Sequence, residues 1–153
     1  MTPVSERLAA LGLSLPAAQP PVASYVPARR HADLLYLSGH VSRADGAVAR
    51  GVVGDDVDSA AAAGMARAIA LDLLASAAAA MGSVDAIVGV VRLTGYVRSA
   101  PGFDGQPAVV NGASDLLVDL FGEAGRHARS AIGVSELPLG AAVEIEAILE
   151  VRG

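Results

Sequence analysis

The chain contains no cysteine and no lysine among its 153 residues. Without cysteine there is no disulfide, no thiolate nucleophile and no zinc–thiolate or iron–sulfur site. All 11 basic residues are arginine, so Schiff-base chemistry on a lysine amine, including attachment of pyridoxal phosphate, is excluded as well. Arginine, carboxylates, tyrosine, hydroxyls, the backbone and water are what remain for chemistry.

Signals for binding a metal, a nucleotide or a nucleic acid are also missing. The three histidines, His31, His40 and His127, show neither H-x-H nor H-x-x-x-H spacing, and no G-x-G-x-x-G or Walker sequence occurs. The formal charge of −5 opposes nucleic-acid binding, which needs a local excess of positive charge to displace counterions. We therefore expect no metal, no organic cofactor and no nucleic-acid partner.

The sequence is apolar for its length, because 53% of its residues are hydrophobic. Some apolar surface should therefore face another subunit. The longest run rich in alanine and leucine, residues 60–81, is interrupted by Arg67 and Asp72. Glu6 and Arg7 stand where a signal peptide would be apolar. These features predict no membrane span and a cytoplasmic location.

The order of the predicted elements indicates one α+β domain over residues 1–153, with two helices packed on one face of a mixed sheet. Residues 1–23 should hold an N-terminal helix, from Ser5 as N-cap to Leu11, and a proline-rich arm that continues irregularly to residue 30. The remaining elements follow from apolar periodicity and turn signals. They are a strand over residues 33–41 ending in Ser38-Gly39, a turn at Asp45-Gly46, a helix from Asp58 or Ser59 to Met81, a strand over 85–97, a helix from Pro107 to Gly122, and strands over 130–134 and 141–151.

The final strand separates its side chains by face, since alternate residues of a strand point in opposite directions. One set is wholly apolar and should pack under the helices: Val143, Ile145, Ala147, Leu149 and Val151. The other set includes Glu144, Glu146 and Glu150, and we expect a neighbouring subunit to cover it in part.

Two stretches of this chain resemble the RidA family, also called the YjgF family. They are SYVPARRHADLLYLSGHV near the start and ARSAIGVSELPLGAAVEIEAILEV at the end. The family pattern has a tyrosine, a strand ending in Ser-Gly, and a C-terminal R-x-x-(V/I)-x-V-x-x-L-P-x-x-A-x-(V/I)-E-(I/V)-E signature. The segment SAPGFDGQPAVVNGASDLLVDLFGEAGRHARSA is similar, more narrowly, to its chorismate-mutase-like endoribonuclease subgroup.

The resemblance covers most of the chain from about Val22 onward and implies a chorismate-mutase-like fold and a homotrimer with active sites between subunits. It also implies hydrolysis of reactive 2-imino acids, such as 2-iminopropionate, to a keto acid and ammonia. Such a site needs no cofactor, in keeping with the missing residue types. A planar guanidinium would bind the substrate carboxylate through two charge-assisted hydrogen bonds, and a partly buried glutamate would aim the water.

Residue by residue, the resemblance assigns the carboxylate-binding arginine to Arg129 and the glutamate that positions water to Glu144. It assigns pocket-lining roles to Tyr25, Ser38, Gly39 and Asn111, and a largely backbone role to Ala131, where the family often has cysteine. His40 replaces the glutamine common after Ser-Gly, and the long PGFDGQP loop leaves the choice of substrate open.

Each assignment has an ordinary alternative. Arg129 could pair with an acidic residue at a subunit interface, and Glu144 could be a solvated strand residue. Tyr25 could anchor the arm, Asn111 could cap its helix, and His127 beside Arg126 should lie on the surface. At the level of function, the alternatives are a non-catalytic trimer that binds small carboxylates and, ranked lower, an endoribonuclease. Chorismate-mutase activity ranks last, because a shared fold carries no site.

Overall fold

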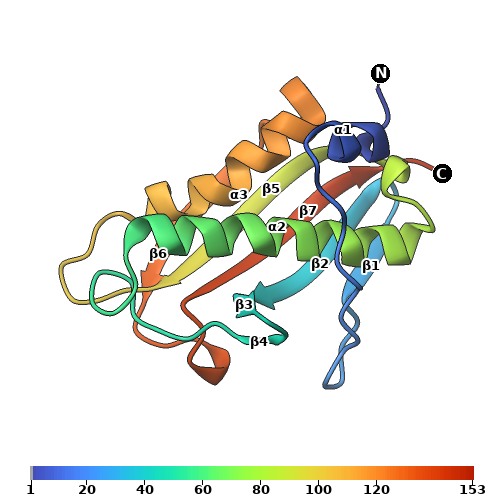
Figure 1. The fold of residues 1–153 in the computed structure, drawn as a ribbon. Coiled ribbons are helices and arrows are strands. Elements are labelled where there is room, and N and C mark those ends of the chain that lie inside the picture. The colour runs from blue at the N-terminus through green and yellow to red at the C-terminus, as the bar shows by residue number, and fades with distance from the viewer. Residues whose placement is uncertain (1) are drawn as a thin grey trace.

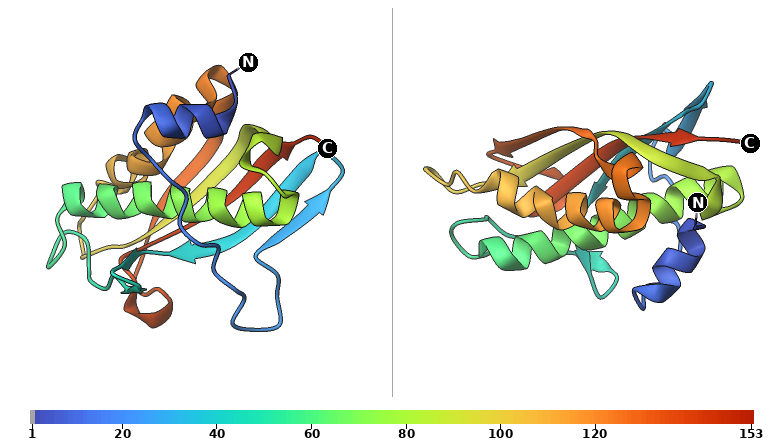
Figure 2. Two further views of the ribbon diagram at one scale, coloured as in Figure 1. Left: turned by 45° about the vertical axis from the view of Figure 1, so that its right-hand side comes forward. Right: turned by 90° about the horizontal axis from the view of Figure 1, so that it is seen from above.

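The computed structural model describes residues 2–153 as two layers, a five-stranded sheet and the helices that cover one of its faces (Figure 1). The strand order is β1-β2-β7-β5-β6. β5 and β6 run parallel, whereas the other neighbouring strands are antiparallel. Seen from above in Figure 2, α2 and α3 lie on the same side of the sheet. The predicted α+β fold with two helices on one face is confirmed.

The elements fall close to their predicted positions. The sheet comprises β1 (Ala28–His31), β2 (Leu34–Val41), β5 (Ile87–Arg98), β6 (Ala128–Val134) and β7 (Val143–Val151). A separate hairpin of β3 (Arg43–Ala44) and β4 (Ala47–Val48) turns at Asp45-Gly46, where both residues have positive φ as predicted for a tight hairpin turn. The helices are α1 (Val4–Ala10), α2 (Ser59–Met81) and α3 (Gln106–Phe121), with short 3₁₀ turns η1 (Val84–Ala86), η2 (Gly122–Gly125) and η3 (Pro138–Gly140).

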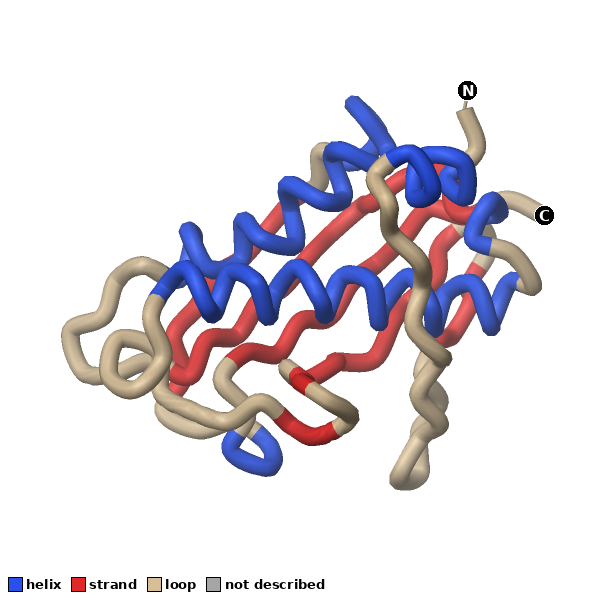
Figure 3. Tube along the Cα trace, in the orientation of Figure 1, coloured by secondary structure: helices blue, strands red, loops and turns tan. Residues whose placement is uncertain are grey.

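The N-terminal region differs from its prediction in two respects. Ser5 is not an N-cap, because α1 begins one residue earlier and the Ser5 hydroxyl donates to Asp85 at 2.8 Å instead. Residues 28–30 are not part of an irregular arm, because the backbone beyond Pro27 is free to pair and forms β1 against β2. The remaining arm crosses over α2 (Figure 3), where Pro20 and Pro21 line a hollow together with alanines of that helix.

α2 is capped as the sequence predicts. The Asp58 side chain accepts from the Ala61 N–H at 2.7 Å, and Gly82 ends the helix in the left-handed conformation. By length and composition alone α2 could cross a membrane, despite Arg67 and Asp72 within it. In the structure α2 is a core helix, with Ile69 and Leu74 fully buried against the sheet.

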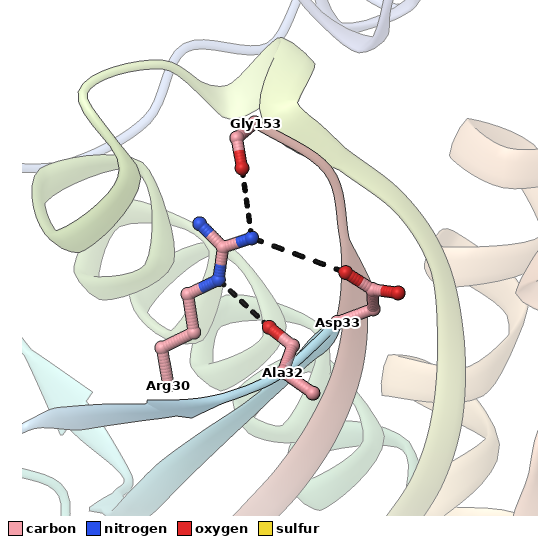
Figure 4. Close-up of polar contacts among 4 residues, drawn as sticks. All are labelled: Arg30, Ala32, Asp33 and Gly153. Atoms are coloured by element: carbon pink, nitrogen blue, oxygen red, sulfur yellow. Dashed lines mark hydrogen bonds and ion pairs between the residues drawn. The ribbon is translucent and has the colours of Figure 1, made fainter.

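The turn between β1 and β2 is tied to the residues that follow β7 (Figure 4). Arg30 donates to the carbonyl of Ala32 at 2.8 Å and to the carbonyl of Gly153 at 2.9 Å. Its guanidinium also lies 4.0 Å from the carboxylate of Asp33. Because all these groups are exposed, the contacts fix the local path of the turn and contribute little to stability.

The two faces of the sheet differ in character. The predicted apolar face of β7 is buried under the helices. The opposite face, which we call the open face, carries half-buried Glu144 and Glu146 together with Tyr36 and Ile132, which are 44% and 46% exposed. Single exposed apolar residues are common, but here they accompany partly buried carboxylates on one sheet surface. This arrangement suits contact with another protein surface.

Candidate active site

Arg129 lies on the helix-covered side of the sheet, against α3. Its register partner on β5 is the fully buried Leu93, so both side chains leave the sheet on the same face. Arg129 Nη1 donates to Asn111 Oδ1 at 2.7 Å and to Ser114 Oγ at 3.1 Å, and Nη2 donates to the Pro107 carbonyl at 3.4 Å. We call Arg129, Asn111 and Ser114 the arginine cluster.

The positive charge of Arg129 has no counter-charge among the residues that the structure describes. Among residues 2–153, no carboxylate lies within ion-pair distance of its guanidinium, and its three acceptors are all neutral. Ala131, two residues further along β6, is partly buried against the hydrophobic core on the same side. The structure therefore brings together three of the predicted residues: Arg129, Asn111 and Ala131.

His127 extends the arginine cluster and is not the surface residue that the sequence suggested. Its ring is half-buried, with Nδ1 2.7 Å from the Gly125 carbonyl and Nε2 3.0 Å from Ser114 Oγ. Burial lowers the pKa of His127, and the charge of Arg129 lowers it further, although the hydrogen bond to Gly125 opposes the change. The signal for Ser114 was its place three residues after Asn111, on the same face of a helix.

Four of the predicted site residues line one hollow, which we call the glutamate pocket: Tyr25, Ser38, Gly39 and Glu144. The strand does not end at Ser38-Gly39 as predicted. β2 continues to Val41, with an irregularity in its pairing to β7 between Leu37 and His40. A Cβ at position 39 would overlap Glu144 Oε1, so a glycine is needed for the carboxylate to lie there. His40 is instead tied to α2, because its Nε2 lies 2.8 Å from Ser76 Oγ.

The Glu144 carboxyl is partly buried, as expected of a glutamate that aims the water. Burial raises its pKa, and the nearby charge of Glu146 raises it further. Glu146 in turn accepts a hydrogen bond from Tyr96 Oη at 3.2 Å. Burial, followed by the charge of Glu146, raises the pKa of Tyr96, so Tyr96 remains a neutral donor at physiological pH.

Replacing Glu144 with glutamine should therefore stabilise the protein increasingly as pH rises. A carboxyl whose pKa is higher in the folded than in the unfolded state stabilises the folded protein at pH values below its unfolded pKa. This stabilisation is lost as the pH rises through the folded pKa. Urea unfolding of the parent and Glu144→Gln from about pH 4 to about pH 7 measures the difference. A Glu144→Gln protein that loses stability relative to the parent over this range would contradict the raised pKa. Glu150→Gln is the control for removing a charge elsewhere on the same strand, since Glu150 is exposed and makes no side-chain hydrogen bond or ion pair among residues 2–153.

The arginine cluster and the glutamate pocket lie on opposite faces of the sheet. Leu93 is the register partner of both Arg129 on β6 and Ala147 on β7, which places those two strands roughly 10 Å apart. Glu144 lies three residues before Ala147 on β7, which adds about 10 Å along the strand. It shares the open face with its register partner Tyr96. One chain therefore does not bring Arg129 and Glu144 to a common substrate.

Comparison with known proteins identifies the family. The model of the family described as Endoribonuclease L-PSP matches residues 16–151. This chain belongs to that family. The family is the one that the sequence resembles under the names RidA and YjgF, so that resemblance is confirmed.

Relatives of the Endoribonuclease L-PSP family align along nearly the whole chain. Protein TCP17 of Trypanosoma cruzi is 41% identical over 151 residues, covering 97% of this chain and 94% of the relative. The crystal structure of Atu1372 from Agrobacterium tumefaciens, a protein of unknown function, is 43% identical with a TM-score of 0.88, covering 97% and 92% of the two chains. RidA from the Antarctic bacterium Psychrobacter is 26% identical with a TM-score of 0.61, covering 88% and 94%.

Proposed function

We propose that this protein is a RidA-type hydrolase of reactive 2-imino acids, such as 2-iminopropionate, in which Arg129 binds the substrate carboxylate. The observation that carries the proposal is the state of the Arg129 guanidinium. Three of its five N–H donors bind neutral acceptors, which leaves one on Nε and one on Nη2 without a partner among residues 2–153. A positioned cation with two donors left over is suited to a carboxylate.

Glu144 supplies the second half of the chemistry in this proposal. It accepts a proton from water as the water oxygen bonds to the imine carbon, and passes that proton to the imine nitrogen to give a carbinolamine. Glu144 then takes the hydroxyl proton of the carbinolamine and returns it to that nitrogen, so that the C–N bond breaks as the C=O bond forms, which releases ammonia and leaves the keto acid. The raised pKa of Glu144 supports this role, because it brings the proton affinity of the carboxylate closer to the working pH. Tyr25, Ser38 and Gly39 line the same pocket.

We further propose that the active site forms between subunits of a homotrimer in the cytoplasm. The arginine cluster of one subunit would face the glutamate pocket of the next, since the two lie on opposite faces of a single chain. Such a heterologous contact repeats around a ring and closes it. The partly apolar open face, with Tyr36 and Ile132 exposed, supports an interface between subunits.

A non-catalytic trimer that binds small carboxylates is the alternative from a different class. It would use Arg129 in the same way but would not depend on Glu144. The family description makes endoribonuclease activity a third candidate. The formal charge of −5 and the absence of lysine weigh against it, because RNA binding relies on positive charge.

Arg129→Ala should abolish the acceleration of 2-iminopropionate hydrolysis and leave the assembly intact, because it removes the carboxylate partner and little packing. The test generates the imine in situ and compares keto-acid release by the parent and the variant with the spontaneous rate. Size-exclusion chromatography of both proteins is the control. Equal acceleration by Arg129→Ala would overturn the assigned role of Arg129. Carboxylate binding without turnover, unaffected in Glu144→Ala, would favour the binding trimer.

A further inference from the structure

A continuous chain of hydrogen bonds leads from Arg129 to the backbone behind it. Arg129 Nη1 donates to Ser114 Oγ at 3.1 Å, Ser114 Oγ lies 3.0 Å from His127 Nε2, and His127 Nδ1 lies 2.7 Å from the Gly125 carbonyl. A carbonyl only accepts, so His127 Nδ1 must carry a proton. In the neutral ring Nε2 is then an acceptor, and the Ser114 hydroxyl donates to it. This leaves the lone pairs of Ser114 for Arg129.

We propose that Ser114 and His127 are positioning residues, which hold the Arg129 guanidinium so that its two unused N–H donors face the substrate carboxylate. The choice of carboxylate as the ligand rests on the proposed function, whereas the positioning of Arg129 does not.

The need for such support follows from where Arg129 lies. The residue is on β6, which lies at one edge of the sheet. Its long side chain would lose considerable rotamer entropy on being fixed. The hydrogen-bond chain joins three elements, because Ser114 is on α3, Gly125 ends η2 and Arg129 is on β6. Apart from Ser114, only Asn111 and the more distant Pro107 carbonyl accept from the guanidinium among residues 2–153. Losing Ser114 therefore removes one of the two side chains that orient the guanidinium.

His127 is suited to this role because it is half-buried and neutral. Burial and the neighbouring Arg129 charge both lower its pKa, which keeps Nε2 available as an acceptor at neutral pH. A second histidine–serine pair, His40 Nε2 with Ser76 Oγ at 2.8 Å, has the same composition but is not hydrogen-bonded to any arginine among residues 2–153. It provides a matched control within the same chain.

The experiment compares four variants: Ser114→Ala, His127→Phe, His127→Gln and Ser76→Ala. The first readout is ¹⁵N NMR of the Arg129 side chain, in which restricted rotation of the guanidinium gives separate Nη signals. We expect Ser114→Ala and His127→Phe to average these signals through free rotation. His127→Gln keeps an acceptor for Ser114 and should retain the parent pattern, as should Ser76→Ala.

The second readout is steady-state imine hydrolysis. Ser114→Ala and His127→Phe should raise KM about tenfold with kcat nearly unchanged, because a hydrogen bond to a charged group that binds the substrate carboxylate has been lost. His127→Gln should restore KM to near the parent value, which a purely structural role for the ring would not predict.

Unchanged Arg129 signals in His127→Phe would overturn the proposal, as would equal effects of His127→Gln and His127→Phe on KM. A parent protein that neither hydrolyses the imine nor binds pyruvate would instead overturn the proposed function. The NMR comparison would still decide whether Ser114 and His127 position Arg129.

Discussion

Mixing inactive Arg129→Ala subunits with inactive Glu144→Ala subunits should restore about a quarter of the parent activity. In the proposed cyclic trimer each site would take Arg129 from one subunit and Glu144 from the next, so random mixing would leave both groups intact at about one site in four. Each variant alone should lose at least about 100-fold, the usual range for removing a general base or a substrate-orienting group. Coexpression, or mixing after unfolding, followed by the imine assay, measures the recovery.

A matched mixture provides the control. Arg129 and Asn111 belong to the same arginine cluster, with Arg129 Nη1 2.7 Å from Asn111 Oδ1. Each site therefore takes both residues from one subunit, and mixing two variants that each lack one of them restores no site. Arg129→Ala mixed with Asn111→Ala should therefore show only the average of the two separate activities. No recovery in the first mixture would reject an active site shared between subunits.

Gly112→Ala should destabilise the protein by about 2 kcal/mol, even though alanine is the better helix former. A Cβ at position 112 would lie 2.7 Å from the carbonyl carbon of Ala63 and 3.1 Å from its Cα, in the backbone of α2. Main-chain atoms of a packed helix move away less readily than the end of a flexible side chain, so α3 must shift. The free energy of unfolding by urea gives the cost.

Gly64→Ala is the counterpart of this substitution on α2. Gly64 is exposed, and a Cβ there would meet no atom within 4 Å, so the change should stabilise the protein by about 1 kcal/mol. The contrast between these two glycines tests the helix contact directly. A Gly112→Ala protein as stable as Gly64→Ala would show that α2 and α3 separate at little cost.

Local chemistry made most elements of the fold predictable. α2 begins after Asp58 and ends at Gly82 as expected, because capping depends on residues close in the sequence. The alternation in β7 correctly separated its buried residues from Glu144. β1 was missed because it follows Pro27, and the prolines of the arm hid a short strand that only its pairing with β2 reveals.

The candidate site was predictable as a set of residues but not as an arrangement. Sequence resemblance named Arg129 and Glu144 without showing that they face opposite ways, since the face of Arg129 is set by the non-local register of β6 on β5. The contact between Ser114 and His127 depends on two side-chain conformations and on a turn at η2. Such features leave no periodic pattern in a single sequence.

The parallel pairing of β5 with β6 also bears on how this protein folds. Parallel strands cannot be joined by a tight turn, so the chain connects β5 to β6 through α3 and η2. Contacts of this kind close a long loop and tend to form slowly, whereas β1 and β2 pair across two residues. The pairs β2–β7 and β5–β7 close still longer stretches of chain. The β1–β2 hairpin can therefore form early, whereas the arginine cluster belongs to the part of the sheet that must wait for non-local pairing.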